Sequence, residues 1–367
     1  MNIFKKYYFK TYLIIKYGFH WKKPVFILKI FRNLIKAKLF NFLRIFGINK
    51  FQPKGIDFAT SYVFNFKCPY CYAARLTPKE NIRLMKIEDY KKAGQQAIKL
   101  GFITFSFQGG EPALERRLLD IIDAFQPKYH HITVTTNGSL LTEELLKSWA
   151  GAGVDTVYFS IDSGIAKEHD KIRNQPGNFN KIMQAMEWVK KYGMKTAINT
   201  VVSKENLYSE GFKKILDFSH KNRLMLETIY ARPLGRWAGH AELMLSQKDI
   251  DYYYNLRKNY PFVVRDLDNN YGHWGCPAVK EVLYVTPFGD VCGCPYNHIS
   301  LGNLHEEPLE KIRARGLSSP WYDHYHYECL TAIDENFINT YLPLADKEGL
   351  VAFKDLELAS LQKKSEI

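Results

Sequence analysis

Two closely spaced pairs of cysteines are the residues of this chain best suited to metal chemistry. Cys68 and Cys71 have two residues between them, and Cys292 and Cys294 have one. Six cysteines in 367 residues do not make the pattern of a disulfide framework, so the spacing indicates metal ligation in a reducing compartment. A zinc site is an alternative for Cys68 and Cys71, because Cys-x2-Cys pairs are common zinc ligands.

The elements around the first pair alternate between strand-like and helix-like patterns. Such alternation predicts a parallel sheet with right-handed crossovers, and residues that follow its strands should gather at their carboxyl ends. The first predicted strand leads directly into the Cys68–Cys71 pair. The predicted strands are 58–63, 103–107, 132–136, 156–161, 196–202 and 226–231, and the predicted helices between them are 87–100, 117–125, 142–152, 179–192 and 208–221.

A glycine-rich turn, Gly109-Gly110-Glu111-Pro112, follows the second predicted strand. Two glycines let the backbone approach a ligand closely, and carbonyls or the Glu111 carboxylate can accept hydrogen bonds from an ammonium group. The alternative is an ordinary strand-to-helix turn, with Glu111 as an acid in the first turn and Pro112 at its start.

Taken in order, these motifs resemble those of radical S-adenosylmethionine (radical SAM) enzymes. The resemblance covers about residues 56–240 and includes the cysteine loop, the Gly-Gly-Glu-Pro turn and the run Thr135-Thr136-Asn137-Gly138. It implies an α/β fold with a partial (β/α)6 TIM-like barrel. It also implies a 4Fe-4S cluster and SAM as cofactors, which together supply a 5′-deoxyadenosyl radical that abstracts hydrogen from a substrate.

The resemblance also implies which residues contact SAM. The Gly-Gly-Glu-Pro turn would bind its amino group, the positions of Ser160 and Arg173 would meet its ribose and carboxylate, and Tyr70 would lie against adenine. The residues predicted to bind the cofactor are Tyr70, Gly109, Gly110, Glu111, Asn137, Ser160, Arg173 and Asn199. The alternatives are a turn cap for Asn137, a helix cap for Ser160, a surface ion pair for Arg173 and loop packing for Tyr70.

One residue departs from the family pattern. The family's cluster loop reads Cys-x3-Cys-x2-Cys, and Cys68 and Cys71 take its second and third positions while Phe64 takes the first. Phenylalanine offers no thiolate to a cluster. A catalytically silent binding or scaffold protein with the radical SAM fold is therefore the alternative to an active enzyme.

The cysteines beyond residue 240 form a second group. The spacing Cys276-x12-Gly289-x4-Cys294 resembles the SPASM or twitch extension of radical SAM enzymes, a β-hairpin and helix that bind auxiliary 4Fe-4S clusters. Gly289 and its neighbour Asp290 fit a tight hairpin turn. Since a full SPASM domain needs seven cysteines, the four present support one auxiliary cluster, and these are Cys276, Cys292, Cys294 and Cys329.

Alternatives stay open for single members of this group. Cys292 and Cys294 are close for two ligands of one cluster, so one of them is a candidate bystander, and Cys329 also suits a buried free thiol. Zinc in place of iron–sulfur is a further alternative. His324 and His326 either line the substrate side or lie at the surface.

Positive charge is concentrated in the first 50 residues, which hold 12 Lys or Arg and no Asp or Glu. Because the whole chain has a formal net charge of +13, residues 51–367 contribute only +1, which disfavours a nucleic-acid-binding body. A helix is predicted over 25–46. Its projection places Lys29, Arg32, Asn33, Lys36 and Arg44 on one face and Ile27, Ile30, Phe31, Leu34, Ile35, Leu39, Phe42 and Ile45 mainly on the other.

This pattern predicts a basic amphipathic helix on an anionic membrane surface. The alternatives are a helix packed on the barrel with its basic face in solvent, and a contact with RNA or an acidic partner. A membrane-spanning helix is not expected, because it would need about 20 mostly apolar residues.

These features predict four parts: a basic helical extension at 1–52, a radical SAM core at 53–240, a SPASM/twitch-like auxiliary-cluster domain at 241–335 and a C-terminal tail at 336–367. We expect a cytoplasmic enzyme, peripheral at the inner face of a membrane. Its partners would be a peptide, lipid or glycan substrate and a reducing electron donor.

Overall fold

The computed structural model describes residues 16–17, 22–76, 83–268, 270–272, 274–348 and 350–353, and side chains within these ranges except at 343–348. In this part of the chain, nine strands form one sheet in the order β7-β6-β5-β4-β3-β2-β1-β8-β9. Strands β1 to β8 run parallel, and β9 is antiparallel to β8. The strands are β1 Gly55–Ser61, β2 Thr104–Gly109, β3 His131–Thr136, β4 Thr156–Ser160, β5 Lys195–Val202, β6 Met225–Tyr230, β7 Val263–Arg265, β8 Val282–Val285 and β9 Val291–Cys292.

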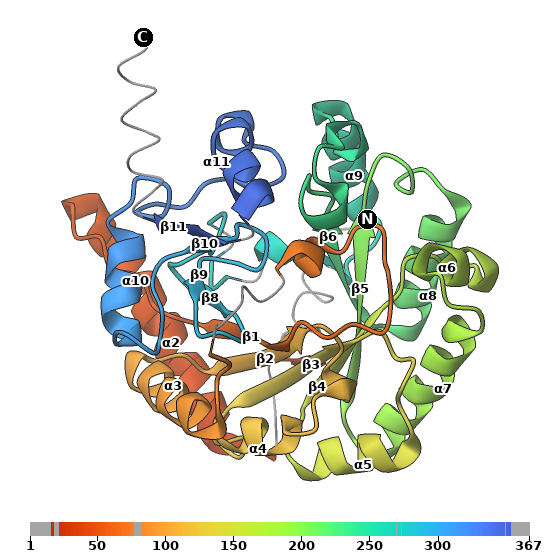
Figure 1. The fold of residues 1–367 in the computed structure, drawn as a ribbon, viewed down its shortest axis with the longest axis horizontal. Coiled ribbons are helices and arrows are strands. Elements are labelled where there is room, and N and C mark those ends of the chain that lie inside the picture. Colours follow the sequence, from red (N-terminus) through yellow and green to blue (C-terminus); the bar gives the residue numbers. More distant parts are fainter. Residues whose placement is uncertain are drawn as a thin grey trace.

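Helices cover the outer side of this curved sheet, with α3, α4, α5, α7 and α8 following one another around it (Figure 1). The arrangement confirms the predicted α/β class and partial TIM-like barrel. The helices are α2 Pro24–Leu43, α3 Ile87–Leu100, α4 Leu118–Asp123, α5 Glu143–Gly151, α6 Ala166–Arg173, α7 Asn178–Lys191, α8 Glu210–Asn222, α9 Gln247–Arg257, α10 Leu309–Leu317 and α11 Glu335–Glu348. Short 3-10 helices include η2 Arg44–Phe46, η3 Tyr72–Arg75, η4 Pro112–Leu114 and η5 Gly235–Trp237. A separate two-stranded parallel sheet is formed by β10 Ile299–Ser300 and β11 Val351–Ala352.

Aromatic side chains fill the layer between the sheet and the helices. Phe58 on β1 and Phe107 on β2 both contact Phe125, with ring centroids 4.7 and 5.3 Å apart. Alternate residues of each strand point to opposite faces, so Asp57 and Glu227 lie on the inner face of the barrel instead. The apolar layer holds the helices on the outside and leaves polar residues for the lumen.

Two differences from the predicted elements have clear causes. Strand β1 ends at Ser61 and not at 63, because the chain turns there into the cysteine loop. Helix α6 was not predicted, since it is short and polar and buries only His169 and Arg173.

The C-terminal cysteine region is continuous with the barrel. Strand β8 pairs in parallel with β1, and a turn with Gly289 at φ +87° leads into β9. The predicted boundary at 240 therefore falls within a region that adds strands to the same sheet. Residues 354–367 of the predicted tail lie outside the described residues.

Helix α2 crosses the amino ends of the strands. Asn33 Nδ2 donates to the Gly101 carbonyl just before β2 at 3.0 Å, and Lys23 Nζ donates to the His130 carbonyl just before β3 at 2.9 Å. Lys23 also pairs with buried Asp155, which precedes β4. Within the described ranges, no helix combines the length and apolarity that crossing a bilayer requires.

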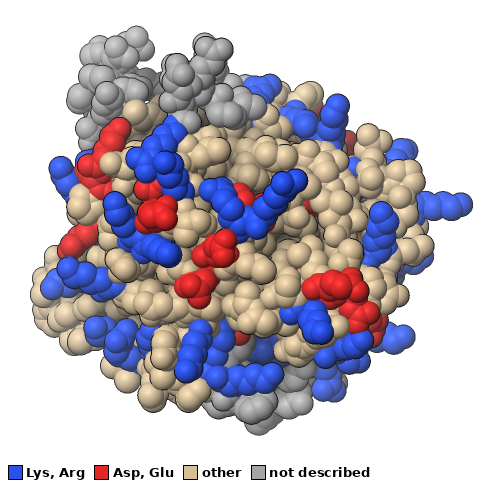
Figure 2. Space-filling view, turned by 60° about the horizontal axis from the view of Figure 1, so that its bottom comes forward, with Lys and Arg blue, Asp and Glu red and all other residues tan. Residues whose placement is uncertain are grey.

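The charges of the body are mixed. On the face shown in Figure 2, Lys and Arg side chains lie interspersed with groups of Asp and Glu. This mixture is in keeping with the near-neutral formal charge of residues 51–367.

Candidate active site

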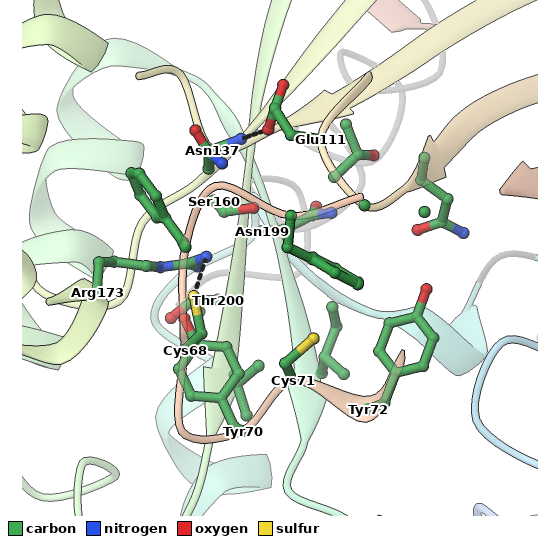
Figure 3. Close-up of a pocket in the computed structure, with 18 of the residues that line it drawn as sticks. Cys68, Tyr70, Cys71, Tyr72, Glu111, Asn137, Ser160, Arg173, Asn199 and Thr200 are labelled. Atoms are coloured by element: carbon green, nitrogen blue, oxygen red, sulfur yellow. Dashed lines mark hydrogen bonds between the residues drawn. The ribbon is translucent and has the colours of Figure 1, made fainter. Parts of the chain in front are cut away.

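A pocket opens at the carboxyl ends of strands β2 to β6 and encloses about 1060 Å³ of empty space, including its mouth (Figure 3). Parallel strands bring residues far apart in the sequence to this one edge. The structure places every predicted residue of the barrel site in the lining: Phe64, Cys68, Tyr70, Cys71, Gly109, Gly110, Glu111, Asn137, Ser160, Arg173 and Asn199.

The two glycines allow the cysteine loop to lie against the end of β2. The nitrogen of Gly110 donates to the Ser61 carbonyl at 2.7 Å, and a Cβ at Gly110 would stand 1.9 Å from the Val63 carbonyl oxygen. Gly109 has φ +121°, a backbone conformation that favours glycine. Both positions therefore need glycine to place the loop that carries Phe64, Cys68 and Cys71.

A second turn holds the loop from the other side. The Arg236 guanidinium donates to the Cys68 carbonyl at 2.8 Å, and a Cβ at Gly235 would stand 2.1 Å from the Cys71 carbonyl oxygen. The cysteine loop is thus held between β2 and the turn η5, with Cys68 and Cys71 beside the pocket.

Glu111 is buried and already well supplied with donors. Its carboxylate accepts hydrogen bonds from the Thr136 hydroxyl at 2.6 Å, the Asn137 nitrogen at 2.8 Å and the Ala113 nitrogen at 3.1 Å. Burial raises its pKa, while these donors act in the opposite direction. The side chain caps η4 and ties the end of β2 to the end of β3, so the strand-to-helix-turn alternative holds for Glu111.

Asn137 likewise caps the turn after β3. Its Oδ1 accepts from the nitrogen and the hydroxyl of Ser139, at 3.0 and 2.7 Å. Its Nδ2 donates to Asn65 Oδ1 at 2.8 Å, next to Phe64. Asn137 therefore connects the third strand to the cysteine loop, and the turn-cap alternative is present in the structure.

Arg173 lies in a buried polar cluster and not in a surface ion pair. Its Nε is 2.5 Å from Asp162 Oδ2, and its Nη1 is 3.5 Å from the Cys68 sulfur (Figure 3). The guanidinium carbon lies 5.2 Å from the centre of the Tyr70 ring, and the Tyr70 hydroxyl donates to Asp162. Asp162 thus holds both Arg173 and Tyr70 at the pocket.

Three residues of the pocket lining have a buried side-chain oxygen without a hydrogen-bond partner in the described structure. They are Asn199 and Thr200 on β5, through Oδ1 and Oγ1, and Tyr230 at the end of β6, through its hydroxyl. A buried polar atom without a partner costs free energy, so these oxygens are suited to a ligand with hydroxyl or amine donors. Ser160 lines the same pocket from the end of β4.

Arg232 is a site residue that we did not predict. Its Nη2 is 3.3 Å from the Cys329 sulfur and 2.6 Å from Asp266, and its carbon stacks 3.9 Å from the centre of the Tyr296 ring. It also lines the pocket. A signal was available, because Arg232 directly follows the sixth predicted strand, as Ser160 ends the fourth.

Three of the four C-terminal cysteines lie in one neighbourhood. Cys294 interacts electrostatically with Cys276 and Cys329, and burial raises the pKa of Cys276 and of Cys294. Cys292 also interacts electrostatically with Cys294, but its side chain packs in a separate cluster with Ala59 and Tyr284. Cys292 is therefore the stronger candidate for the bystander.

The two histidines predicted near Cys329 do not line the pocket. His324 is exposed beside Asp323, and His326 is within hydrogen-bond distance of the Trp321 carbonyl at 3.0 Å. The surface alternative therefore applies to His324, whereas His326 is half-buried and stacks on Trp321.

The donor set at the barrel site does not match the three-thiolate cluster of the family. Phe64 lines the pocket and offers no thiolate, so Cys68 and Cys71 are the two thiols among the described lining residues. Burial, and then the neighbouring Cys68, raise the pKa of Cys71 to about 11, so a bound metal would be needed to hold it as a thiolate. Among the described residues, no three His, Cys, Asp or Glu side chains are arranged to hold a metal ion.

Comparison with known proteins agrees with this architecture. The radical SAM superfamily matches residues 65–218, starting one residue after Phe64, and the SPASM iron–sulfur cluster-binding domain matches residues 276–320. AdoMet-dependent heme synthase of Methanosarcina barkeri is 24% identical over 288 residues, which cover 71% of this chain and 82% of that protein.

Two further relatives are a bacteriocin biosynthesis protein and a peptide cyclase. The antilisterial bacteriocin subtilosin biosynthesis protein AlbA of Bacillus subtilis is 24% identical and covers 72% of this chain, but only 61% of its own length is matched. PqqA peptide cyclase of Rhizobium meliloti is 24% identical over 70% of this chain and 70% of that protein.

Among solved structures, Streptococcus suis SuiB bound to S-adenosylmethionine aligns with a TM-score of 0.57 at 17% identity, over 77% of this chain and 69% of SuiB. A likeness at this identity shows the fold. The relatives named above are enzymes, and two sequence profiles match in the expected order. Residues 65–218 thus form a radical SAM domain, and residues 276–320 form a SPASM iron–sulfur cluster-binding domain that follows it.

Proposed function

We propose that this chain is a radical SAM enzyme that binds S-adenosylmethionine in the barrel pocket and modifies a peptide. The observation that carries the proposal is the convergence of Cys68, Cys71, the Gly109–Gly110 turn and Asn199 of β5 on one pocket. When bound, a 4Fe-4S cluster with SAM supplies a radical able to take hydrogen from an unactivated carbon.

The protein's own groups divide into positioning and binding roles. Glu111 and Asn137 already have partners, and they hold the strand ends and the cysteine loop in place. Asn199 lies on the inner face of β5, and its Oδ1 is our candidate acceptor for a ribose hydroxyl. Arg173 would face the carboxylate of SAM only with a change of its contact to Cys68, because its Nε is engaged by Asp162.

A peptide is the substrate class that the relatives support. The structural neighbour SuiB has been solved bound to the precursor peptide SuiA, and PqqA peptide cyclase is named for a peptide. A lipid or glycan substrate remains the competing proposal. Cys276, Cys294 and Cys329 are our candidates for the ligands of one auxiliary cluster, which would pass electrons from a reducing donor.

Phe64 favours a second candidate function. With one thiolate replaced, the barrel is suited to binding SAM or peptide without turnover, as a silent member of the superfamily. The two candidates differ in whether Cys68 and Cys71 hold a cluster, which only the metal content of the protein can decide.

The test is the formation of 5′-deoxyadenosine by anaerobically reconstituted, dithionite-reduced protein, with Phe64→Cys measured beside it. Product from the natural chain supports the enzyme. Product from Phe64→Cys alone, with about four additional irons bound, identifies a silenced enzyme. No product from either protein, with SAM binding retained in calorimetry, supports the silent binding protein.

A further inference from the structure

Helix α2 buries Phe26, Asn33 and Ala37 against the barrel and leaves most of its large apolar side chains exposed. On its barrel side, Asn33 is fully buried, and Lys29 Nζ lies 2.6 Å from His130 Nε2. On its outer side, Leu28, Phe31, Ile35, Leu39 and Phe42 are each at least half exposed. An amphipathic helix normally buries its apolar face and leaves its polar face in water.

The exposed residues form one stripe. Their spacing of three or four residues places them on a single face of a helix that is about 30 Å long. Ile45 and Phe46 in η2, directly after α2, are also exposed, with exposed fractions of 77% and 66%. We call Leu28, Phe31, Ile35, Leu39, Phe42, Ile45 and Phe46 the apolar stripe.

Positive charge borders the apolar stripe. Arg32 and Lys36 are exposed on one side of it and Lys38 on the other. No acidic residue occurs anywhere in the first 50 positions. A neutral protein surface would complement the apolar stripe alone, whereas an anionic bilayer complements both the stripe and the charges beside it.

We infer that the apolar stripe and its flanking cations dock this protein on an anionic membrane surface, with α2 lying in the interface. The apolar side chains enter the boundary between headgroups and acyl chains, and Arg32, Lys36 and Lys38 contact phosphate groups. This inference is independent of the proposed function, because no residue of the pocket takes part in it.

Helix α2 and the pocket lie at opposite ends of the barrel strands, which determines how the pocket faces when α2 is docked on a membrane. Helix α2 contacts residues that precede β2, β3 and β4, such as Gly101 and His130. The pocket is lined by residues at the opposite, carboxyl ends of these strands, such as Gly109 and Ser160. A protein docked by α2 holds its pocket on the side away from the bilayer, where a peptide in solution arrives and a lipid embedded in the same bilayer does not.

Vesicle binding of the full chain tests the inference. We expect binding to mixed phosphatidylglycerol–phosphatidylcholine vesicles and much weaker binding to phosphatidylcholine alone. The variant Phe31→Gln/Ile35→Gln/Leu39→Gln should bind at least about 10-fold more weakly, since each side chain loses apolar burial. Lys36→Gln/Lys38→Gln should bind about 10-fold more weakly at low salt, with a reduced salt dependence.

The control replaces apolar side chains that are exposed elsewhere, in Leu119→Gln/Leu140→Gln, and should bind like the natural protein. Circular dichroism checks that each variant is folded. The inference is overturned if the natural protein does not bind anionic vesicles, or if the triple variant binds them equally well. It is also overturned if the triple variant only converts a dimer to a monomer in sedimentation, or if the chain binds RNA and not vesicles.

Discussion

Arg173 joins the pocket to the polar residues behind it. One guanidinium contacts the Asp162 carboxylate, the Cys68 sulfur and the face of Tyr70, and the side chain is 7% exposed. A buried charge in such a cluster is stable only while its partner is present. The residue therefore has a structural role in addition to any contact with a ligand.

Replacement of Arg173 by methionine should lower the free energy of unfolding by about 3–5 kcal/mol, because Asp162 would be left buried and unpaired. Urea denaturation measures the change. Adding Asp162→Asn to this variant should restore part of the loss, and Arg116→Met at an exposed site should change stability by less than about 0.5 kcal/mol. A loss below about 1 kcal/mol in Arg173→Met would contradict the buried pair.

Glu227 gives the barrel lumen a pH dependence. Burial, and then the carboxylates of Asp266 and Asp57, raise the pKa of Glu227 to about 8, against the opposing effect of Lys54. In the unfolded chain the group titrates near its ordinary value of about 4.5, so the folded state retains a proton that the unfolded state loses. The free energy of unfolding therefore decreases progressively as the pH rises from about 4.5 to above 8.

Glu227→Gln removes this penalty. We expect the variant to exceed the natural protein in unfolding free energy by about 1–3 kcal/mol at pH 8.5, and the difference to shrink toward pH 4.5. Urea titrations at both pH values, with Glu210→Gln on the exposed surface of α8 as the control, measure it. A difference that is the same at both pH values would mean that Glu227 does not titrate in this window.

At the scale of elements, the turn after β2 decides where the cysteine loop lies. Gly110→Ala would bring a methyl group against the Val63 carbonyl and displace the loop. We expect a loss of about 2–4 kcal/mol in unfolding free energy, together with weaker SAM binding in calorimetry. Gly151→Ala is the matched control, because the added Cβ meets open space at the end of α5. This substitution should raise the unfolding free energy by up to about 1 kcal/mol. Equal effects of the two substitutions would rule out the close approach.

Elements and strand ends were predictable from local patterns, and side-chain partners were not. All six predicted barrel strands occur. The rule that residues at strand ends converge placed Asn137 and Ser160 in the pocket, and Asn199, predicted within the fifth strand, also lines it. The helical pattern of α2 revealed two faces, but not that Asn33 is the one residue of its polar face that is fully buried, beside Phe26 and Ala37, while much of the apolar face stays exposed. That choice depends on acceptors such as the Gly101 carbonyl, which only the folded chain brings nearby.

At the scale of the whole molecule, the sheet joins the barrel to the C-terminal cysteine region. Strand β8 is hydrogen-bonded to β1 on one side and to β9 on the other, so it lies inside the sheet. The pairing of β1 with β8 joins residues more than 200 positions apart, for example Phe58 with Val285, and a local pattern cannot predict such a contact. Arg232 adds a side-chain link from β6 to Cys329.

This continuity predicts that β8 and the barrel unfold as one unit. Native-state hydrogen exchange should give the amides of Leu283 in β8 and Val134 in β3 the same opening free energy, within about 1 kcal/mol, and the same dependence on denaturant. The amide of Val351, in the separate two-stranded pair, is the internal control and should exchange at a lower free energy. An opening free energy for the Leu283 amide that is several kcal/mol below that of Val134 would contradict this prediction. It would mean that β8 separates from β1 while the rest of the sheet stays folded, so that the cysteine region opens independently of the barrel.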